Sequence, residues 1–276
     1  MIGVFYFRSS RASLPSISSV YADWNNQDYE SVYKNTSLIL NKRPLDGEAL
    51  ALNGFAAYYM YVGQTEPSAA YMYLDSSITN LRKAWYRVSD TEKPQISYIL
   101  GKAYYHRGHY YSDLAMKYLD YADSAGLQYD DLQEFRGLAA AQLGEYEIAI
   151  DAFTEALAKK PSDLLLYTIA QNYNNIGDIE KSKQYLLETI RTTNDEVLQL
   201  KCRYMLGEIL FFEGDIEDAK KEFDLILEKD ENSADAHYGL GVIYENQGDL
   251  VRARAEWRRA IRLNPVHPGA RQKLNL

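Results

Sequence analysis

Small and apolar residues near the C-terminal end of the chain recur with the spacing of α-helices. Between residues 234 and 246, positions three, one and three apart form one stripe, which carries His237, Leu240, Gly241 and Tyr244. Gly248 and Asp249 suit the exit of one helix and the cap of the next. A second stripe then carries Ala253, Trp257 and Ala260. The pattern predicts two helices joined by a short turn.

The same pattern recurs along the chain with a period of about 34 residues. Gly207, Gly214, Ala219 and Phe223 precede their counterparts in the last copy by 34 positions. A fixed period of this size predicts a stacked array of helical hairpins rather than a globule with one closed core. We expect an all-α fold of about seven repeats, which span residues 13–46, 47–93, 94–129, 130–162, 163–199, 200–233 and 234–267, with tails at 1–12 and 268–276.

The spacing of the last repeat resembles that of the tetratricopeptide repeat, a helix-turn-helix unit. The resemblance is carried by Leu240, Gly241, Tyr244, Ala253, Trp257, Ala260 and Pro265. One departure is Arg136, which stands where the repeat at 130–162 should carry leucine. The resemblance implies a right-handed superhelical solenoid with a concave groove. It also implies a non-catalytic scaffold or adaptor that binds a protein or peptide partner, whose identity the sequence does not give.

In an array of this type, the first helix of each repeat faces the groove through positions 2, 5, 9, 12 and 13. Positions 5 and 12 are rich in aromatic residues and amides here, and the residues that we expect to bind the partner are Tyr98, Tyr105, Tyr167, Asn174, Tyr204, Phe211 and Tyr238. Rigid rings give contact area at low entropic cost, and hydroxyl groups can bond to a peptide backbone. The alternative is that these tyrosines pack against one another and line no groove. Lys102 and Gln171, at position 9, do not reproduce the clamp of chaperone-binding repeats.

Residues that could carry catalysis do not converge in the sequence. His106 and His109 are close together, but they fall at an expected turn and have no third ligand nearby. Cys202 is the only cysteine, so it can form neither an internal disulfide nor a cysteine metal site. We therefore expect no enzyme activity, no metal and no cofactor. The net charge of −9 argues against a nucleic-acid partner.

The charge is nevertheless uneven along the chain. From residue 250 to the end, seven lysines and arginines face one acid, Glu256, which gives this end a charge of +6. Residues 1–7 are apolar but too few to span a bilayer, so they predict either a tail that packs on the first repeat or the remnant of an anchor. These features give an alternative function: a membrane-anchored envelope assembly protein that docks through its basic C-terminal end. The lone cysteine slightly favours a cytoplasmic setting, whereas a truncated N-terminus would favour a membrane-anchored or periplasmic one.

The second repeat is the longest and carries one further alternative. After Pro67, apolar residues follow a heptad stripe up to Val88, namely Tyr71, Leu74, Ile78, Leu81 and Trp85. The pattern predicts one helix over residues 67–88. This helix either packs on its neighbours or presents the region around Trp85 for self-association.

Overall fold

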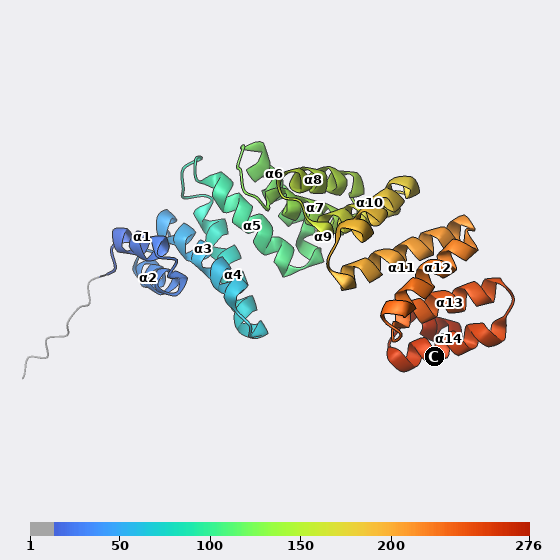
Figure 1. Cartoon of the computed structure of the whole chain (residues 1–276). Helices are drawn as coiled ribbons and strands as arrows, with labels where there is room; N and C mark the ends of the chain where they lie inside the picture. The colour runs from blue at the N-terminus through green and yellow to red at the C-terminus, as the bar shows by residue number, and fades with distance from the viewer. Residues whose placement is uncertain (1–13) are drawn as a thin grey trace, which may run out of the picture. The chain divides into compact units, whose positions relative to one another are not determined.

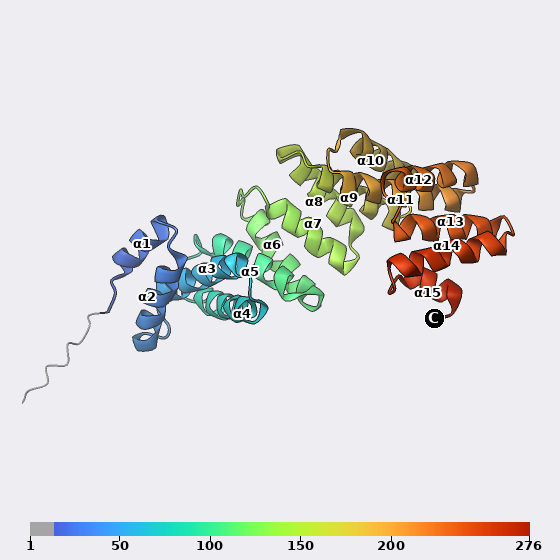
Figure 2. The same cartoon turned by 60° about the horizontal axis from the view of Figure 1, so that its bottom comes forward.

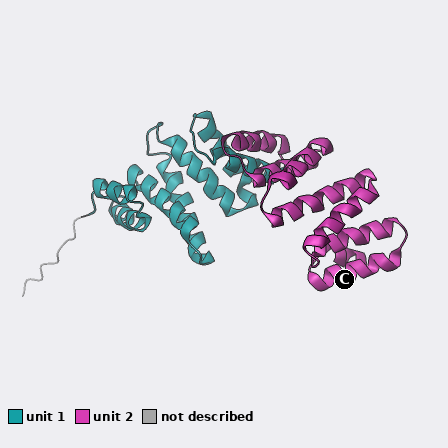
Figure 3. Ribbon diagram, in the orientation of Figure 1, with its two compact units in different colours: residues 1–144 teal, residues 145–276 magenta. Residues whose placement is uncertain are grey.

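The computed structural model describes residues 14–276, which form helices joined by short turns and loops. They form fifteen α-helices and one short 3₁₀ helix and contain no strand, so the expected all-α helical-repeat fold is confirmed. The expectations for residues 1–12 lie outside the described residues. The chain divides into unit 1, which ends at Gly144, and unit 2, residues 145–276, and each is described by itself (Figure 3). None of the helices in residues 14–276 has the length and apolar character needed to cross a membrane.

Unit 1 is built from consecutive antiparallel helices (Figure 1). They are α1 (Ile17–Asn25), α2 (Tyr29–Lys42), α3 (Gly47–Gly63), α4 (Pro67–Ala84), α5 (Lys93–Arg107), α6 (Ser112–Ser124) and α7 (Leu132–Leu143), with the 3₁₀ helix η1 (His109–Tyr111) before α6. Each helix packs on the next, and the pairs α3–α4 and α5–α6 form the most extensive contacts of the unit.

Unit 2 continues the same arrangement (Figure 2). Its helices are α8 (Tyr146–Lys159), α9 (Asp163–Asn175), α10 (Ile179–Thr192), α11 (Glu196–Glu213), α12 (Ile216–Lys229), α13 (Ala234–Asn246), α14 (Leu250–Leu263) and α15 (Pro268–Leu274). The first helices of the last two repeats, α11 and α13, also contact each other directly.

The C-terminal segment 268–276 is not the simple tail that the sequence suggested. Its residues 268–274 form α15, which packs against α14 and buries Ala270 completely. Pro268 occupies the first turn of this helix, where its missing N–H costs nothing. The imidazole of His267 caps the helix by accepting a hydrogen bond from the backbone N–H of Ala270 at 3.1 Å.

The paired helices approach closely where the repeat carries a small residue. A Cβ atom added at Gly54 would lie 2.5 Å from Cγ of Leu81, and one added at Gly101 would lie 2.5 Å from Cγ of Leu119. Both leucines are fully buried. The small residue of the first helix and the large residue of the second therefore form one packing unit in each of these two helix pairs.

The expected helix over 67–88 is wrong at its C-terminal end, because α4 ends at Ala84. The chain turns there through a tight hydrogen bond from the N–H of Arg87 to the carbonyl of Ala84, at 2.7 Å. Trp85 packs against α6, with ring centroids 5.8 Å from Tyr118 and 5.0 Å from Tyr121. Trp85 is therefore engaged within unit 1, which removes the overhang on which the self-association alternative depended.

Arg136, the departure from the repeat pattern, is explained by an ion-pair network between α6 and α7. Its guanidinium lies 2.9 Å from Asp120 and 3.2 Å from Asp123, and it donates to the side-chain oxygen of Gln133 at 2.8 Å. Gln133 in turn donates to Asp123 at 2.7 Å. Polar pairing thus joins two helices at a position where four other repeats carry Leu100, Ile169, Leu206 and Leu240.

Candidate functional site

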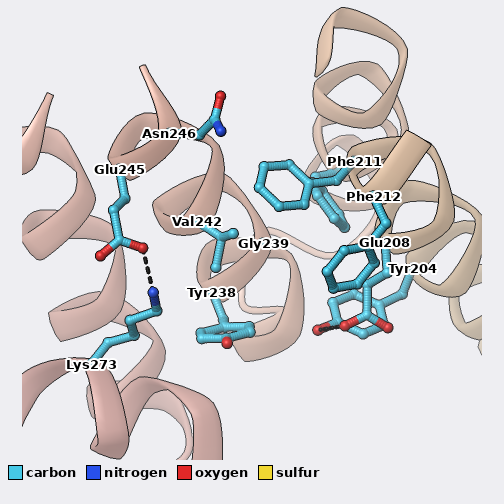
Figure 4. Close-up of a pocket in the computed structure, with 11 residues that line it drawn as sticks. Tyr204, Glu208, Phe211, Phe212, Tyr238, Gly239, Val242, Glu245, Asn246 and Lys273 are labelled. Atoms are coloured by element: carbon cyan, nitrogen blue, oxygen red, sulfur yellow. Dashed lines mark hydrogen bonds and ion pairs between the residues drawn. The ribbon is translucent and has the colours of Figure 1, made fainter. Parts of the chain in front are cut away.

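A pocket of about 360 Å³ lies between helices α11, α13 and α15 of unit 2. We call it the α11–α13 pocket. Its lining residues are Tyr204, Glu208, Phe211, Phe212, Phe223, Tyr238, Gly239, Val242, Glu245, Asn246 and Lys273. Figure 4 shows the side chains from α11 facing those of Tyr238 and Val242 on α13, with Glu245 and Lys273 beyond them.

The last turn of α11 supplies the aromatic wall of this pocket. The rings of Phe211 and Phe212 are edge to face, with centroids 5.7 Å apart. The side chain of Phe212 is 83 % exposed, an unusual position for a phenylalanine. An exposed ring beside a half-buried ring offers apolar surface that a partner can cover.

The opposite wall is fixed by two close approaches between a glycine and a ring. A Cβ atom at Gly239 would lie 2.6 Å from Cζ of Phe223, so this ring forms the floor of the pocket only because position 239 has no side chain. A Cβ atom at Gly269 would lie 2.5 Å from Cζ of Tyr238. The ring of Tyr238 also lies 4.9 Å from that of His267. Helix α15 therefore determines where Tyr238 stands.

Charged groups occupy the two ends of the α11–α13 pocket. On α11, the hydroxyl of Tyr204 donates to Oε1 of Glu208 at 2.9 Å. Burial raises the pKa of Glu208, and the neighbouring carboxylate of Asp235 raises it further. Burial also raises the pKa of Tyr204, so its hydroxyl remains a donor at neutral pH. At the other end, Lys273 of α15 pairs with Glu245 of α13.

Unit 1 contains a second aromatic pocket, of about 580 Å³. We call it the α3–α5 pocket. Its lining residues are Tyr58, Tyr59, Tyr61, Val62, Gln64, Thr65, Pro67, Ala70, Tyr71, Lys102, His106, Asp131 and Phe135. Helix α5 contacts both α3 and α7, and these three helices carry most of the lining side chains.

Lys102 lies among three rings in the α3–α5 pocket. Its Nζ is 4.8 Å from the ring centroid of Tyr98, 4.6 Å from that of Phe135 and 5.6 Å from that of Tyr58. The ammonium also donates to Asp131 at 2.6 Å and to the hydroxyl of Tyr98 at 3.0 Å. Its charge is thus already satisfied within unit 1.

The same ammonium affects the neighbouring His106. Burial lowers the pKa of His106, and the positive charge of Lys102 lowers it further. His106 packs against the rings of Tyr61 and Phe135, at centroid distances of 5.3 Å and 5.5 Å. It is therefore a neutral aromatic neighbour at physiological pH rather than a charged one. Among residues 14–276, no group of three or more His, Cys, Asp and Glu side chains is arranged to hold a metal ion.

Three of the seven residues expected from the sequence meet in the α11–α13 pocket, namely Tyr204, Phe211 and Tyr238. Tyr167 and Asn174 also belong to unit 2 but do not line this pocket. Tyr167 packs on the buried cluster around Leu198 and Leu206, and its hydroxyl accepts a hydrogen bond from Gln171 at 3.1 Å.

The two expected residues of unit 1 form internal contacts. Tyr98 is only 6 % exposed, stacks on Tyr129 with centroids 4.4 Å apart and donates its hydroxyl to Asp131. Tyr105 is half-buried and packs edge to face on Phe135, at 5.5 Å. Neither lines the α3–α5 pocket. For Tyr98 the packing alternative describes the structure better than the groove-lining expectation.

Three of the residues that the sequence reasoning missed share one position in their repeats. Lys102, Glu208 and Val242 all stand at position 9 of their repeats, and each lines one of the two pockets. The clamp of chaperone-binding repeats is the only role that the sequence suggests for position 9. Lys273 lies beyond the last repeat, where the repeat pattern gives no signal.

Two stretches of the chain match family models of the tetratricopeptide repeat, residues 165–194 and residues 204–268. The second stretch spans α12, α13 and α14, together with the pocket-lining end of α11. Both stretches lie in unit 2.

Known proteins and structures show the same kind of similarity. The protein CTR9 homolog of Arabidopsis thaliana is 27 % identical over 120 residues, which are 43 % of this chain and 11 % of that protein. The crystal structure of the C-terminal part of a TPR repeat-containing protein from Cytophaga hutchinsonii superposes with a TM-score of 0.64 at 15 % identity, over 95 % of this chain and 100 % of that one. The crystal structure of YrrB, described as a TPR protein with an unusual peptide-binding site, gives a TM-score of 0.52 at 20 % identity, over 71 % of this chain and 98 % of that one. These structural similarities concern the fold, an all-α helical-repeat solenoid.

Proposed function

Because the chain is a tetratricopeptide-repeat protein, we propose that it is a non-catalytic scaffold that binds a segment of a partner protein in the α11–α13 pocket. The observation that carries this proposal is the meeting of side chains from α11, α13 and α15 around one hollow with an aromatic wall, over a floor formed by Phe223 of α12. Tyr204, Phe211 and Tyr238 are the proposed contact residues. Their role is to pack against the partner and to bond with its backbone.

Both the size and the chemistry of the pocket support this role. A volume of about 360 Å³ is near the lower end of the range for pockets that hold ligands, about 300–1,000 Å³. Such a space suits one or two side chains of a bound segment. Aromatic residues are enriched where binding energy is concentrated in protein interfaces. The peptide-binding site described for YrrB shows that another protein of this fold binds peptides.

The proposal is tested with a displayed library of random dodecapeptides, selected on the whole chain and then measured as synthetic peptides. Phe212→Asp places a charge in the aromatic wall at an exposed position, so the fold should persist. Val251→Asp on α14 is the matched control, because Val251 is also 83 % exposed and lies outside the pocket. Selected peptides that lose affinity for Phe212→Asp but not for Val251→Asp support the proposal. A selection whose peptides bind both variants equally contradicts it.

A second candidate function is docking through the basic C-terminal end, and it also has a structural basis. Arg254, Arg258 and Arg262 are exposed on α14 at helical spacing, and none forms an ion pair with another residue of the range 14–276. Unpaired arginines on one helix face suit an acidic partner. If this surface is the docking site, polyglutamate binds the chain in a salt-dependent manner and the triple Arg→Glu variant loses that binding. The anchor of this alternative falls among residues outside the described range.

A further inference from the structure

We infer that the α11–α13 pocket selects partner segments in which a lysine or arginine stands next to a bulky apolar residue. The basic group pairs with Glu208, and the apolar side chain lies over Gly239 and Val242. This inference rests on the proposed function, since it names the chemistry of the segment that the same pocket binds.

Glu208 is a carboxylate without a cation. It is half-buried in the wall of the pocket, and in the part of the chain that the structure describes its only side-chain hydrogen-bond partner is the hydroxyl of Tyr204, at 2.9 Å. Within residues 14–276, no nitrogen of a lysine, arginine or histidine lies within 4.0 Å of its carboxylate oxygens. A partly desolvated carboxylate gains from a charge-assisted hydrogen bond more than an exposed one does. A ligand cation is the partner that Glu208 lacks.

A second carboxylate, Asp235, adds negative charge at this end of the pocket. It accepts a hydrogen bond from Nε2 of His267 at 3.0 Å. Because Nδ1 of His267 accepts the backbone N–H of Ala270, the proton of the neutral ring must be on Nε2. This hydrogen bond therefore forms with a neutral imidazole, which brings no positive charge to offset Asp235. The negative field of Asp235 reaches Glu208, whose pKa it raises.

The cation at the other end of the pocket is already engaged. Lys273 pairs with Glu245, and its Nζ lies 5.3 Å from the ring centroid of Trp257. The two ends of the pocket therefore differ in character. One end holds a closed ion pair, and the other holds the free carboxylate of Glu208.

The space between the two ends is apolar. Its surfaces come from Gly239, Val242, Phe211, Phe212 and the floor ring Phe223. An apolar side chain placed there covers the exposed ring of Phe212 and removes apolar surface from water. An acidic side chain would instead approach Glu208 and Asp235 with like charge. The electrostatics thus favour a basic-apolar segment over an acidic one.

The test uses the dodecapeptides selected on the whole chain and their Lys→Met or Arg→Met counterparts, which keep an unbranched, flexible side chain and remove its charge. We expect the wild type to bind the basic peptide about tenfold more tightly than its Met counterpart. Glu208→Gln should bind the two peptides equally. Glu217→Gln, an exposed change on α12 outside the pocket, should retain the preference.

A second, independent test reverses both charges, the one at position 208 of the protein and the one on the peptide. Glu208→Lys should prefer the Lys→Glu peptide, and circular dichroism of each variant verifies that it is still helical. A wild type that binds the basic and Met peptides equally, while Phe212→Asp still abolishes binding, overturns the inference but leaves the proposed function in place. Binding that Phe212→Asp does not weaken overturns the proposed function itself.

Discussion

Trp257 lies directly against the backbone of Gly241, so that a Cβ atom at position 241 would come within 2.5 Å of Cδ1 of the indole. The glycine belongs to α13 and the tryptophan to α14, and together they determine how closely the helices of the last repeat approach. The indole is only 3 % exposed. The position of α13, and with it Tyr238 and Val242 of the α11–α13 pocket, therefore depends on this contact.

Gly241→Ala should destabilise the protein despite the better helix propensity of alanine. The gain in propensity is about 1 kcal/mol, whereas overpacking costs about 1–3 kcal/mol, so we expect a net loss of about 1 kcal/mol in the free energy of unfolding. Urea unfolding followed by circular dichroism measures it. Gly63→Ala is the control, because no atom lies within 4 Å of a Cβ there. In the Trp257→Leu background the cost of Gly241→Ala should shrink; an unchanged cost would show that the contact is not responsible.

Asp131→Ala should destabilise unit 1, because it leaves the ammonium of Lys102 among the rings without its carboxylate. Only 12 % of the Lys102 side chain is exposed, against 37 % for Asp131. We expect a loss of about 1–3 kcal/mol in the free energy of unfolding. The double variant with Lys102→Met should recover part of this loss, since a thioether packs well against rings.

The exposed pair of Glu155 and Lys159 gives the comparison for this prediction. Glu155→Ala should change the free energy of unfolding by less than about 1 kcal/mol. If the double variant at positions 102 and 131 were less stable than Asp131→Ala alone, the unpaired ammonium would not be the cause of the loss.

Gly269→Ala should weaken the binding of the selected peptides, although residue 269 does not line the pocket. The added methyl group would collide with the ring of Tyr238 and displace it from the wall of the α11–α13 pocket. We expect a loss of about threefold to tenfold in affinity, measured by isothermal titration calorimetry. In the Tyr238→Ala background the same substitution should have little further effect. Equal losses in both backgrounds would mean that Gly269 acts by another route.

The stability of unit 2 should fall at alkaline pH through Cys202. The thiol is fully buried, and burial raises its pKa from 9.0 to about 12. Between these values the unfolded chain has lost the proton that the folded chain retains, so the free energy of unfolding falls as the pH rises through this window. Below about pH 9 the stabilisation is fully present.

Comparison with Cys202→Ala isolates this contribution, because the tyrosines titrate in both proteins. The stability advantage of the wild type over Cys202→Ala should be about 2 kcal/mol smaller at about pH 11 than at about pH 8. Urea unfolding at the two pH values measures the difference. A constant advantage would indicate that the thiol ionises equally in the folded and unfolded chains.

The fold could be predicted from the sequence because the packing of a small residue on one helix against a large residue on the next recurs along the chain. The small residue of the first helix and the large residue of the second, such as Gly207 and Phe223, are both needed for close packing, and a Cβ atom at Gly207 would lie 2.8 Å from Cε1 of Phe223. Helix ends were less predictable. The apolar heptad that ran on to Val88 concealed the turn after Ala84, where Ser89 and Glu92 bond to each other.

The candidate site could be predicted only in part. The position of a residue in the repeat indicates which way its side chain points, but it does not indicate how deeply other residues bury that side chain. Tyr98, Tyr204 and Tyr238 stand at the same position, yet Tyr98 is covered by Tyr129 while the other two line a pocket. The ring of Tyr129 comes from the loop between α6 and α7, for which the repeat pattern makes no prediction. Lys273 was missed for the same kind of reason, since α15 lies outside the periodic sequence.

The central claim is that partner segments bind across α11, α13 and α15. Amide hydrogen exchange of the whole chain, with and without a saturating selected peptide, tests it most directly. We predict slower exchange within residues 204–212, 238–246 and 268–274, with little change in α12 and α14. Protection confined to α14, or to helices of unit 1, would contradict it.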